Sequence, residues 1–274
     1  MPMPKNLEIN LEKMFFRHLL LLIFVASISC NKDTTTAIAA PKTYTTTTST
    51  VGSLLPKNNI GYTIEHTYYT LSYSEANRQA EWVAYNLSPS LINGLQARTD
   101  DFRIDPKVKN NAVSSGDYAG SGYDRGHLCP AADMKLNLTS MSETFYMSNM
   151  SPQQPSFNRG IWETLESRVR TWALEKNGVY VVTGPVLKNS CGSIDKGTIK
   201  VPCTYYKIIF KDNGADKIAI ALLLNNQASS ASLKSFVTTI DNLENLTGID
   251  FLSGLPDDIE SKIESSINTA SWSW

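Results

Sequence analysis

Residues 121–130 read Ser-Gly-Tyr-Asp-Arg-Gly-His-Leu-Cys-Pro, the most informative stretch of the chain. It places a carboxylate, a guanidinium, a glycine and an imidazole at four consecutive positions, Asp124 to His127. Histidine titrates near neutrality and can act as a general base, while arginine presents fixed donors that suit a phosphate. Of the other two histidines, His18 falls in an expected export signal, and His66 is interpreted as a strand surface residue without a role. His127 is therefore the candidate base.

The composition is that of an ordinary globular protein. The chain has 274 residues, of which 42% are hydrophobic and 19% charged, so it can bury a substantial core. The formal net charge is −1. This excludes a broad basic coat of the kind that binds nucleic acid tightly through phosphates alone. It is compatible with an enzyme that binds nucleic acid weakly in a local basic cleft.

The N-terminal segment 1–30 has the features of an export signal. A basic flank precedes the apolar run 19–26, and small residues lead to Cys30. The run is shorter than the roughly 20 residues of a membrane span. The residues before Cys30 are similar to a lipoprotein signal, in which the cysteine is lipidated, although Ser27 stands where leucine is usual. We expect export as a membrane-anchored lipoprotein of the outer membrane or cell surface. An ordinary cleaved signal, and hence a secreted protein, is the alternative.

The remainder divides into a tether and one domain. Residues 31–52 are rich in threonine and lack hydrophobic periodicity, which predicts a flexible tether. Residues 53–274 contain no repeat and no second linker, so we expect one domain there. Aromatic and β-branched runs predict strands over 62–71, 80–87, 179–183, 204–210 and 217–224, paired as hairpins at the first and last junctions.

Helices are expected in three places. After Asn158, apolar side chains recur at helical spacing from Ile161 to Ala173. Shorter helices are expected over 232–239 and 257–267. Paired strands with long helices between them indicate an α+β domain.

The cysteines fit an exported protein. If Cys30 is lipidated, Cys129, Cys191 and Cys203 remain. Cys191 and Cys203 flank a glycine-containing loop and are expected to close it as a disulfide. Cys129 is then a free thiol, expected to be buried. A catalytic thiol two residues from His127 is the alternative interpretation.

Three segments carry the candidate chemistry: residues 124–127, residues 145–153 (Phe-Tyr-Met-Ser-Asn-Met-Ser-Pro-Gln) and residues 158–166 (Asn-Arg-Gly-Ile-Trp-Glu-Thr-Leu-Glu). Each also has a purely structural interpretation: a turn with a local ion pair, a helix cap at Asn158, and a surface pair at i, i+4. A functional site is favoured because these structural interpretations would have to hold independently in all three segments.

With these motifs in this order, the chain resembles the DNA/RNA non-specific endonuclease family, which includes mitochondrial endonuclease G and secreted bacterial sugar-non-specific nucleases. The resemblance extends from about residue 62 to residue 251 and includes the strand 180–185, Tyr-Val-Val-Thr-Gly-Pro. It implies the ββα-metal nuclease fold, with a central, mostly antiparallel sheet flanked by helices. It further implies cleavage of DNA and RNA with Mg²⁺, for which Mn²⁺ can substitute, and a homodimer.

The resemblance also assigns roles. His127 is the general base that activates water, and Asn158 is the sole protein ligand of the magnesium ion. Arg125, Asn149 and Glu166 support them. A single neutral oxygen suffices because Mg²⁺ keeps several waters and takes phosphate oxygens.

Two further points concern the ends of the site. An upstream arginine, Arg103 or else Arg98, is expected to contact phosphate together with Arg125.

Glu166 follows Asn158 by eight residues, which is about 12 Å of straight helix. We therefore expect Glu166 to order water or Arg125 rather than to bind the metal.

Two rival functions remain. One is a two-metal phosphoesterase that uses Asp124, Asp133 and Glu166 as carboxylate ligands. The other is a non-catalytic surface lipoprotein that binds nucleic acid or a protein partner on a nuclease scaffold.

Overall fold

The computed structural model describes residues 54–57, 60–214 and 216–274. The predicted export signal with Cys30 and the predicted tether lie outside the described residues. Among the helices of the described part, none has the length and apolar character that crossing a membrane requires.

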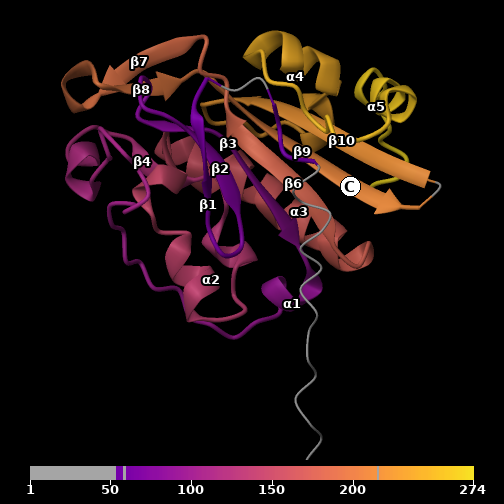
Figure 1. Cartoon of the computed structure of the whole chain (residues 1–274), viewed down its shortest axis with the longest axis horizontal. Helices are drawn as coiled ribbons and strands as arrows, with labels where there is room; N and C mark the ends of the chain where they lie inside the picture. Colours follow the sequence, from indigo (N-terminus) through magenta and orange to yellow (C-terminus); the bar gives the residue numbers. More distant parts are fainter. Residues whose placement is uncertain (1–53, 58–59, 215) are drawn as a thin grey trace, which may run out of the picture. The chain divides into compact units, whose positions relative to one another are not determined.

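The described residues form a seven-stranded sheet in the order β1-β2-β3-β6-β9-β10-β11, and every neighbouring pair is antiparallel (Figure 1). Two further sheets of two strands each pair β4 with β5 and β7 with β8. The large sheet consists of β1 (Tyr62–Glu65), β2 (Thr70–Ser74), β3 (Gln79–Leu87), β6 (Val179–Pro185), β9 (Thr204–Asn213), β10 (Asp216–Asn225) and β11 (Val237–Thr238). The small sheets consist of β4 (Asp124–His127), β5 (Met150–Gln153), β7 (Ser190–Ile194) and β8 (Ile199–Pro202). The predicted α+β class with a mostly antiparallel central sheet is confirmed.

Helices cover both faces of the large sheet. Their bounds are α1 (Pro89–Ile92), α2 (Leu138–Glu143), α3 (Glu163–Glu175), α4 (Ile240–Thr247) and α5 (Asp257–Glu264). Side chains of α1 and α3 join one apolar cluster with alternate residues of the strands. Side chains of α4 and the segment after it join a second cluster with the intervening strand residues. The predicted helix at 257–267 is confirmed as α5, with an earlier end.

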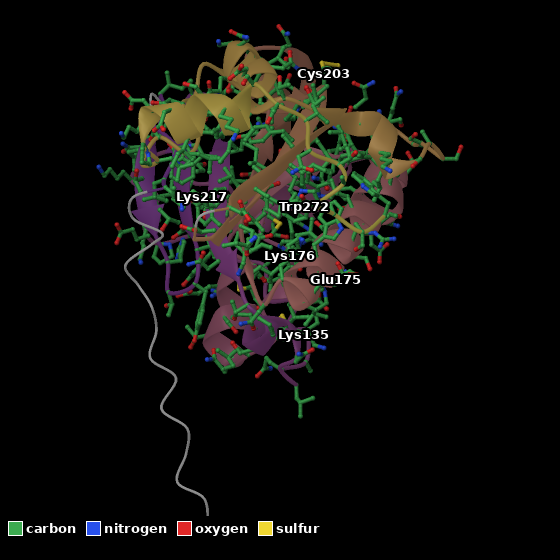
Figure 2. All side chains as sticks on the ribbon, turned by 90° about the vertical axis from the view of Figure 1, so that its right-hand side faces the viewer. Lys135, Glu175, Lys176, Cys203, Lys217 and Trp272 are labelled. Atoms are coloured by element: carbon green, nitrogen blue, oxygen red, sulfur yellow. A yellow bond between two sulfur atoms is a disulfide. The ribbon has the colours of Figure 1, made fainter. Side chains whose placement is uncertain are left out.

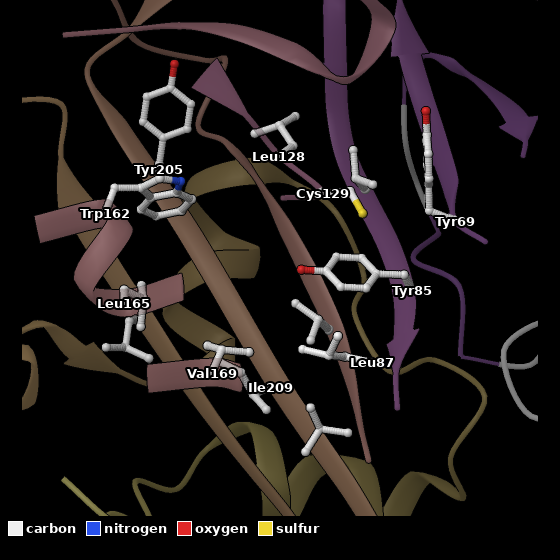
Figure 3. Close-up of a cluster of buried hydrophobic side chains, with 14 of the residues drawn as sticks. Tyr69, Tyr85, Leu87, Leu128, Cys129, Trp162, Leu165, Val169, Tyr205 and Ile209 are labelled. Carbon is white, nitrogen blue, oxygen red and sulfur yellow. The ribbon is translucent and has the colours of Figure 1, made fainter. Parts of the chain in front are cut away.

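The alternation of side chains along the central strands explains these two layers. Successive residues of a strand point to opposite faces. Val181 and Ile209 therefore belong to the cluster under α3, and Val182 and Ile208 to the cluster under α4. Figure 3 shows the first cluster, in which Leu165 of α3 lies among the strand residues. Strands buried on both faces read as continuous apolar runs, which is the pattern at Val179–Pro185.

The C-terminal tail packs on α3. The Trp172 ring meets the rings of Trp272 and Trp274 edge-on, with centroids 5.1 and 5.4 Å away. The ammonium of Lys176 lies 4.7 Å from the Trp272 ring centroid, and Figure 2 shows the two side by side. The chain leaves the helix after Glu175 through Gly178, whose φ of 100° is in the left-handed region and whose N–H donates to Ala173 O. The tail thus closes the apolar face of the helix.

Two predicted elements differ in the structure. The expected strand 62–71 breaks after Glu65, and His66 turns inward, where its Nε2 lies 3.0 Å from Asp105 Oδ2. The interpretation of His66 as a surface residue is therefore wrong, because a carboxylate 39 residues away pairs with it inside the protein. The expected helix 232–239 is a 3₁₀ turn followed by β11, and the helix α4 begins only after Thr239.

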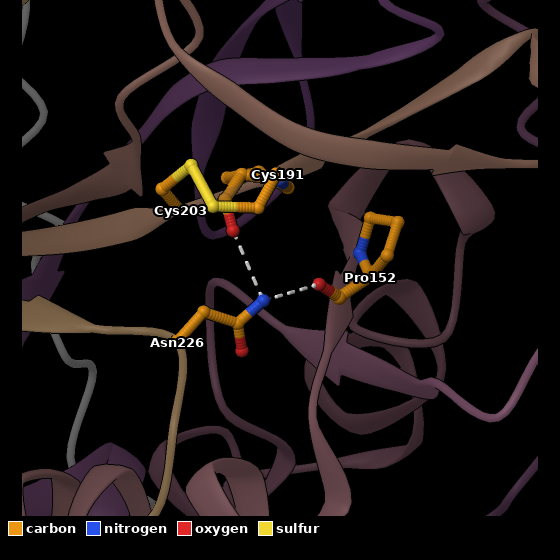
Figure 4. Close-up of a disulfide and its surroundings, with 5 residues drawn as sticks. Pro152, Cys191, Cys203 and Asn226 are labelled. Atoms are coloured by element: carbon orange, nitrogen blue, oxygen red, sulfur yellow. Dashed lines mark hydrogen bonds between the residues drawn. A yellow bond between two sulfur atoms is a disulfide. The ribbon is translucent and has the colours of Figure 1, made fainter.

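A disulfide joins Cys191 in β7 to Cys203, with a Cα–Cα distance of 5.0 Å (Figure 4). Asn226 lies beside it and donates from Nδ2 to Pro152 O at 3.1 Å and Pro202 O at 3.0 Å. The β7–β8 hairpin is thereby tied to β5, the partner strand of β4.

Candidate active site

Strand pairing brings the first two sequence segments together. β4 and β5 are antiparallel, with Asp124 opposite Gln153 and His127 opposite Met150. Asn149 immediately precedes β5 and is completely buried. Its Oδ1 accepts from Cys129 N at 2.8 Å, and its Nδ2 donates to the carbonyls of Cys129 and Thr144. Asn149 therefore holds the backbone just after His127 in place.

The third segment is tied to the first by Asp124. Residues Phe157–Trp162 form a π-helical turn before α3, with non-helical dihedrals at Gly160. Within this turn, Asn158 donates from Nδ2 to Asp124 Oδ2 at 2.9 Å. Arg159 donates to both carboxylate oxygens of Asp124, at 2.6 and 2.9 Å. The side chain of Asn158 thus hydrogen-bonds to Asp124 of β4 instead of capping its own helix.

The charge of Asp124 is stabilised by these contacts. Burial raises the pKa of its carboxyl, but hydrogen bonds from Arg159 and Asn158 and the nearby guanidinium charges outweigh burial and lower the pKa below its usual value. Asp124 is therefore ionised at neutral pH. It fixes the amide of Asn158 with the nitrogen toward β4, which leaves the amide oxygen for a ligand.

An open cleft of about 660 Å³ lies over these residues. Its wall includes Asp124, Arg125 and Asn158, together with Arg98 and Phe102. The Arg125 guanidinium lies 3.9 Å from the Phe102 ring centroid and donates to a serine hydroxyl, and within the described residues it forms no ion pair. Such a guanidinium is available to a phosphate. The cleft is consequently suited to an anionic, solvent-exposed polymer.

His127 is half-buried beside the cleft. Its ring meets Phe102 and Phe145 edge-on, with centroid distances of 5.8 and 5.0 Å. Its buried Nε2 has no hydrogen-bond partner among the described residues. Burial, followed by the positive charges of Arg98 and Arg125, lowers the pKa of His127 to about 3. The imidazole is therefore neutral at pH 7 and can accept a proton. His127 does not itself line the cleft, although Phe102 beside it does.

The two upstream arginines occupy different environments. Arg98 lines the cleft, where its guanidinium lies 4.7 Å from the Phe145 ring centroid and its Nε donates to Asp100 Oδ1 at 2.6 Å. Arg103 donates to Asp101 Oδ2 at 2.6 Å and lies over the Tyr146 ring, and it does not line the cleft. The phosphate contact predicted for one of the two is better supported for Arg98.

Glu166 lies in a buried group of charges on the core side of α3. Burial raises the pKa of Glu166 to about 7, against the opposing effect of Lys207, and Asp133 raises it further. Lys207 is 1% exposed, and its Nζ has no hydrogen-bond partner among the described residues. The largest electrostatic effects on the pKa of Glu166 thus come from Lys207, Asp133 and Arg170 rather than from Arg125. The one indication of Lys207 in the sequence is a lysine inside the apolar run 204–210.

Two alternative chemistries find no support in this geometry. Both oxygens of Asp133 are engaged, one by Arg170 Nη1 at 3.0 Å and one by Tyr85 OH at 2.9 Å. Within the described residues, the carboxylates of the two-metal alternative do not gather into a metal-binding group. Cys129 is fully buried, and burial raises its thiol pKa well above the ordinary value, which opposes a catalytic thiolate.

Comparison with known proteins identifies the family. The family of DNA/RNA non-specific endonucleases matches residues 47–258. The chain belongs to this family. It is similar to a nuclease of Nostoc sp., with 32% identity over 232 residues that cover 80% of this chain and 82% of that protein. It is also similar to human mitochondrial endonuclease G, with 30% identity and 68% of each chain covered.

A solved structure extends the similarity to the fold. The crystal structure of the EndoG/EndoGI complex contains a chain that matches with a TM-score of 0.71 and 28% identity, over 80% of this chain and 94% of that one. The present protein is thus an endonuclease of the DNA/RNA non-specific family, and its substrate is nucleic acid. The predicted fold and enzyme class are confirmed.

Proposed function

We propose that this endonuclease hydrolyses phosphodiester bonds of DNA and RNA without sequence preference in a Mg²⁺-dependent reaction. In this proposal His127 is the general base and Asn158 is the metal ligand. The main supporting observation is that Asp124, in the same strand as His127, holds Asn158 at the wall of an arginine-lined cleft, beside which His127 lies. Arginines that face a cleft bind phosphates, which carry no sequence information. This suits cleavage without sequence preference.

The residues at Asn158 fit a hard cation. The amide nitrogen of Asn158 is engaged by Asp124, so its oxygen is the atom left for a ligand. Mg²⁺ prefers oxygen ligands and keeps several waters, and the open cleft leaves room for them. When bound, the ion supplies charge stabilisation at the phosphoryl group and the leaving oxygen, and Mn²⁺ can replace it.

The protein side chains perform the remaining work. Arg98 and Arg125 bind the phosphate and offset the charge that develops on it. His127 is neutral and takes the proton of the attacking water, a role that contributes about 10²–10⁴ in rate. The phosphate brings negative charge next to the two arginines that depress the pKa of His127. Substrate binding therefore makes the imidazole a stronger base. The products are 5′-phosphorylated oligonucleotides.

The test is cleavage of supercoiled plasmid and of total RNA by the purified protein, with Mg²⁺ or with EDTA. The wild-type protein degrades both substrates only with Mg²⁺. His127→Ala and Asn158→Ala remove this activity, while the control Asn225→Ala, an exposed asparagine of β10, retains it. Folded protein that leaves both substrates intact would support the non-catalytic scaffold instead.

We also propose that the protein is exported and lipid-anchored through Cys30. The signal-like N-terminus supports this, and so does the disulfide between Cys191 and Cys203, because such bonds persist in oxidising compartments. Labelling with a radioactive fatty acid, lost in Cys30→Ser, tests the anchor. A homodimer is a further proposal from the family resemblance, and light scattering of the purified protein tests it.

A further inference from the structure

Three carboxylates meet where α4 approaches α5, away from the cleft. Asp241 and Glu244 come from α4, and Glu264 is the last residue of α5. One oxygen of each can be chosen so that all lie within 4.8 Å of one another. None of the three lines the nuclease cleft. This carboxylate cluster (Asp241, Glu244 and Glu264) therefore has no part in the proposed reaction.

Glu264 distinguishes the cluster from an ordinary acidic surface. Glu264 is only 6% exposed, and its Oε1 is buried without a hydrogen-bond partner among the described residues. A buried carboxylate without a donor is costly. The neighbours of this oxygen in the cluster are acceptors as well, so they cannot satisfy it unless a proton or a cation lies between them.

The surroundings add negative charge to the cluster. Asp250 and Glu260 act on Glu264 from the segment after α4 and from the preceding turn of α5. An opposing charge comes from Lys57, which acts on Glu260 and whose Nζ donates to the Ser253 carbonyl at 3.3 Å. Within the described residues, no lysine or arginine forms a salt bridge with Asp241, Glu244 or Glu264.

We propose that Asp241, Glu244 and Glu264 bind a calcium ion that joins α4 to α5. Ca²⁺ takes six to eight oxygen ligands at about 2.3–2.6 Å, so oxygens on opposite sides of one ion lie about 5 Å apart. The spacing within 4.8 Å fits this range. Ca²⁺ is favoured over Mg²⁺ because it accepts several carboxylates in irregular geometry, whereas Mg²⁺ retains most of its water. The ion would stabilise the helical layer over one face of the sheet, separately from the catalytic metal.

The experiment measures the melting temperature of the full chain as Ca²⁺ is added, in the Asn158→Ala background so that the proposed catalytic metal ligand is absent. At a concentration about 100-fold above the dissociation constant, Ca²⁺ raises the melting temperature by roughly 5–10 °C, and a chelator reverses the effect. Glu264→Gln, which preserves shape, removes the response. Asp258→Asn, an exposed acid of the same helix, retains it. Equilibrium dialysis with radioactive calcium gives one ion per chain.

Two results would overturn the proposal. One is a melting temperature that does not respond to about 10 mM Ca²⁺, a concentration above the roughly 10⁻⁴–10⁻³ M range of extracellular calcium modules. It would show that a shared proton, rather than an ion, satisfies Glu264. The other is a response that survives Glu264→Gln. Should that variant unfold, Asp241→Asn replaces it, and retained calcium binding in Asp241→Asn overturns the proposal equally.

Discussion

Gly126, between Arg125 and His127, offers the sharpest test of how the site is held. A Cβ built on Gly126 would lie 2.2 Å from Gln153 Oε1, 2.3 Å from its Cδ and 2.5 Å from its Cγ. The backbone of Gly126 is not in the left-handed region, so glycine is needed here for space and not for conformation. Gln153 is completely buried, and its amide has no hydrogen-bond partner within the described residues. Packing alone therefore holds the side chain of Gln153 against β4.

The expected size of the effect follows from these distances. Ordinary contact begins at 3.4 Å, so Gly126→Ala must separate the two groups by at least about 1.2 Å. Overpacking of this kind costs about 1–3 kcal/mol of unfolding free energy. A displacement of about 1 Å at a reacting group can lower the rate about 10²-fold. We therefore expect a folded but destabilised variant whose kcat/KM on plasmid DNA falls about 100-fold, because β4 carries His127.

The assay combines urea unfolding with plasmid cleavage kinetics. Gly116→Ala is the control, because Gly116 lines the cleft and its added Cβ would meet nothing closer than 3.6 Å. Adding Gln153→Ala to Gly126→Ala removes the three clashing atoms and should restore much of the activity. Wild-type kcat/KM in Gly126→Ala, or a double variant that is no more active than Gly126→Ala, would refute the reasoning.

Three further predictions concern stability. The pKa of His127 is about 3 in the folded protein and near 6.5 in the unfolded chain. The contribution of neutral His127 to the unfolding free energy is therefore fully present above pH 6.5 and is lost as the pH falls toward 3. Between pH 7 and 5 the wild type should lose up to about 2 kcal/mol more than His127→Gln in urea titrations, and parallel curves would contradict this. Cys191 and Cys203 are 12 residues apart in the sequence, and replacing both by serine removes the cross-link that closes the loop between them. This should lower the unfolding free energy by about 3 kcal/mol in the same assay. Lys207→Met should lower the unfolding free energy in the same assay, because Glu166 loses the charge that most opposes the effect of burial on its carboxyl, and adding Glu166→Gln should recover part of that loss.

Much of the architecture could be predicted from local patterns. The apolar run that became β6 and the turn between β9 and β10 are consequences of side-chain alternation and turn residues within a few positions. The order of the site motifs identified the family before any geometry was available. The break after Glu65 could not be predicted, because the aromatic and β-branched pattern continues through His66 while Asp105 draws that ring inward.

The chemical types at the site were determined by the sequence alone: an imidazole and a guanidinium in one block, and an amide in another. Which atoms face the cleft was decided only by the tertiary structure. Asp124 orients the amide of Asn158 across 34 residues, and packing selects Arg98 over Arg103 for the cleft wall. The burial of Lys207 likewise required the sheet and α3 to come together. The physical reason is that composition and periodicity report local conformation, whereas burial and charge pairing depend on contacts between distant segments.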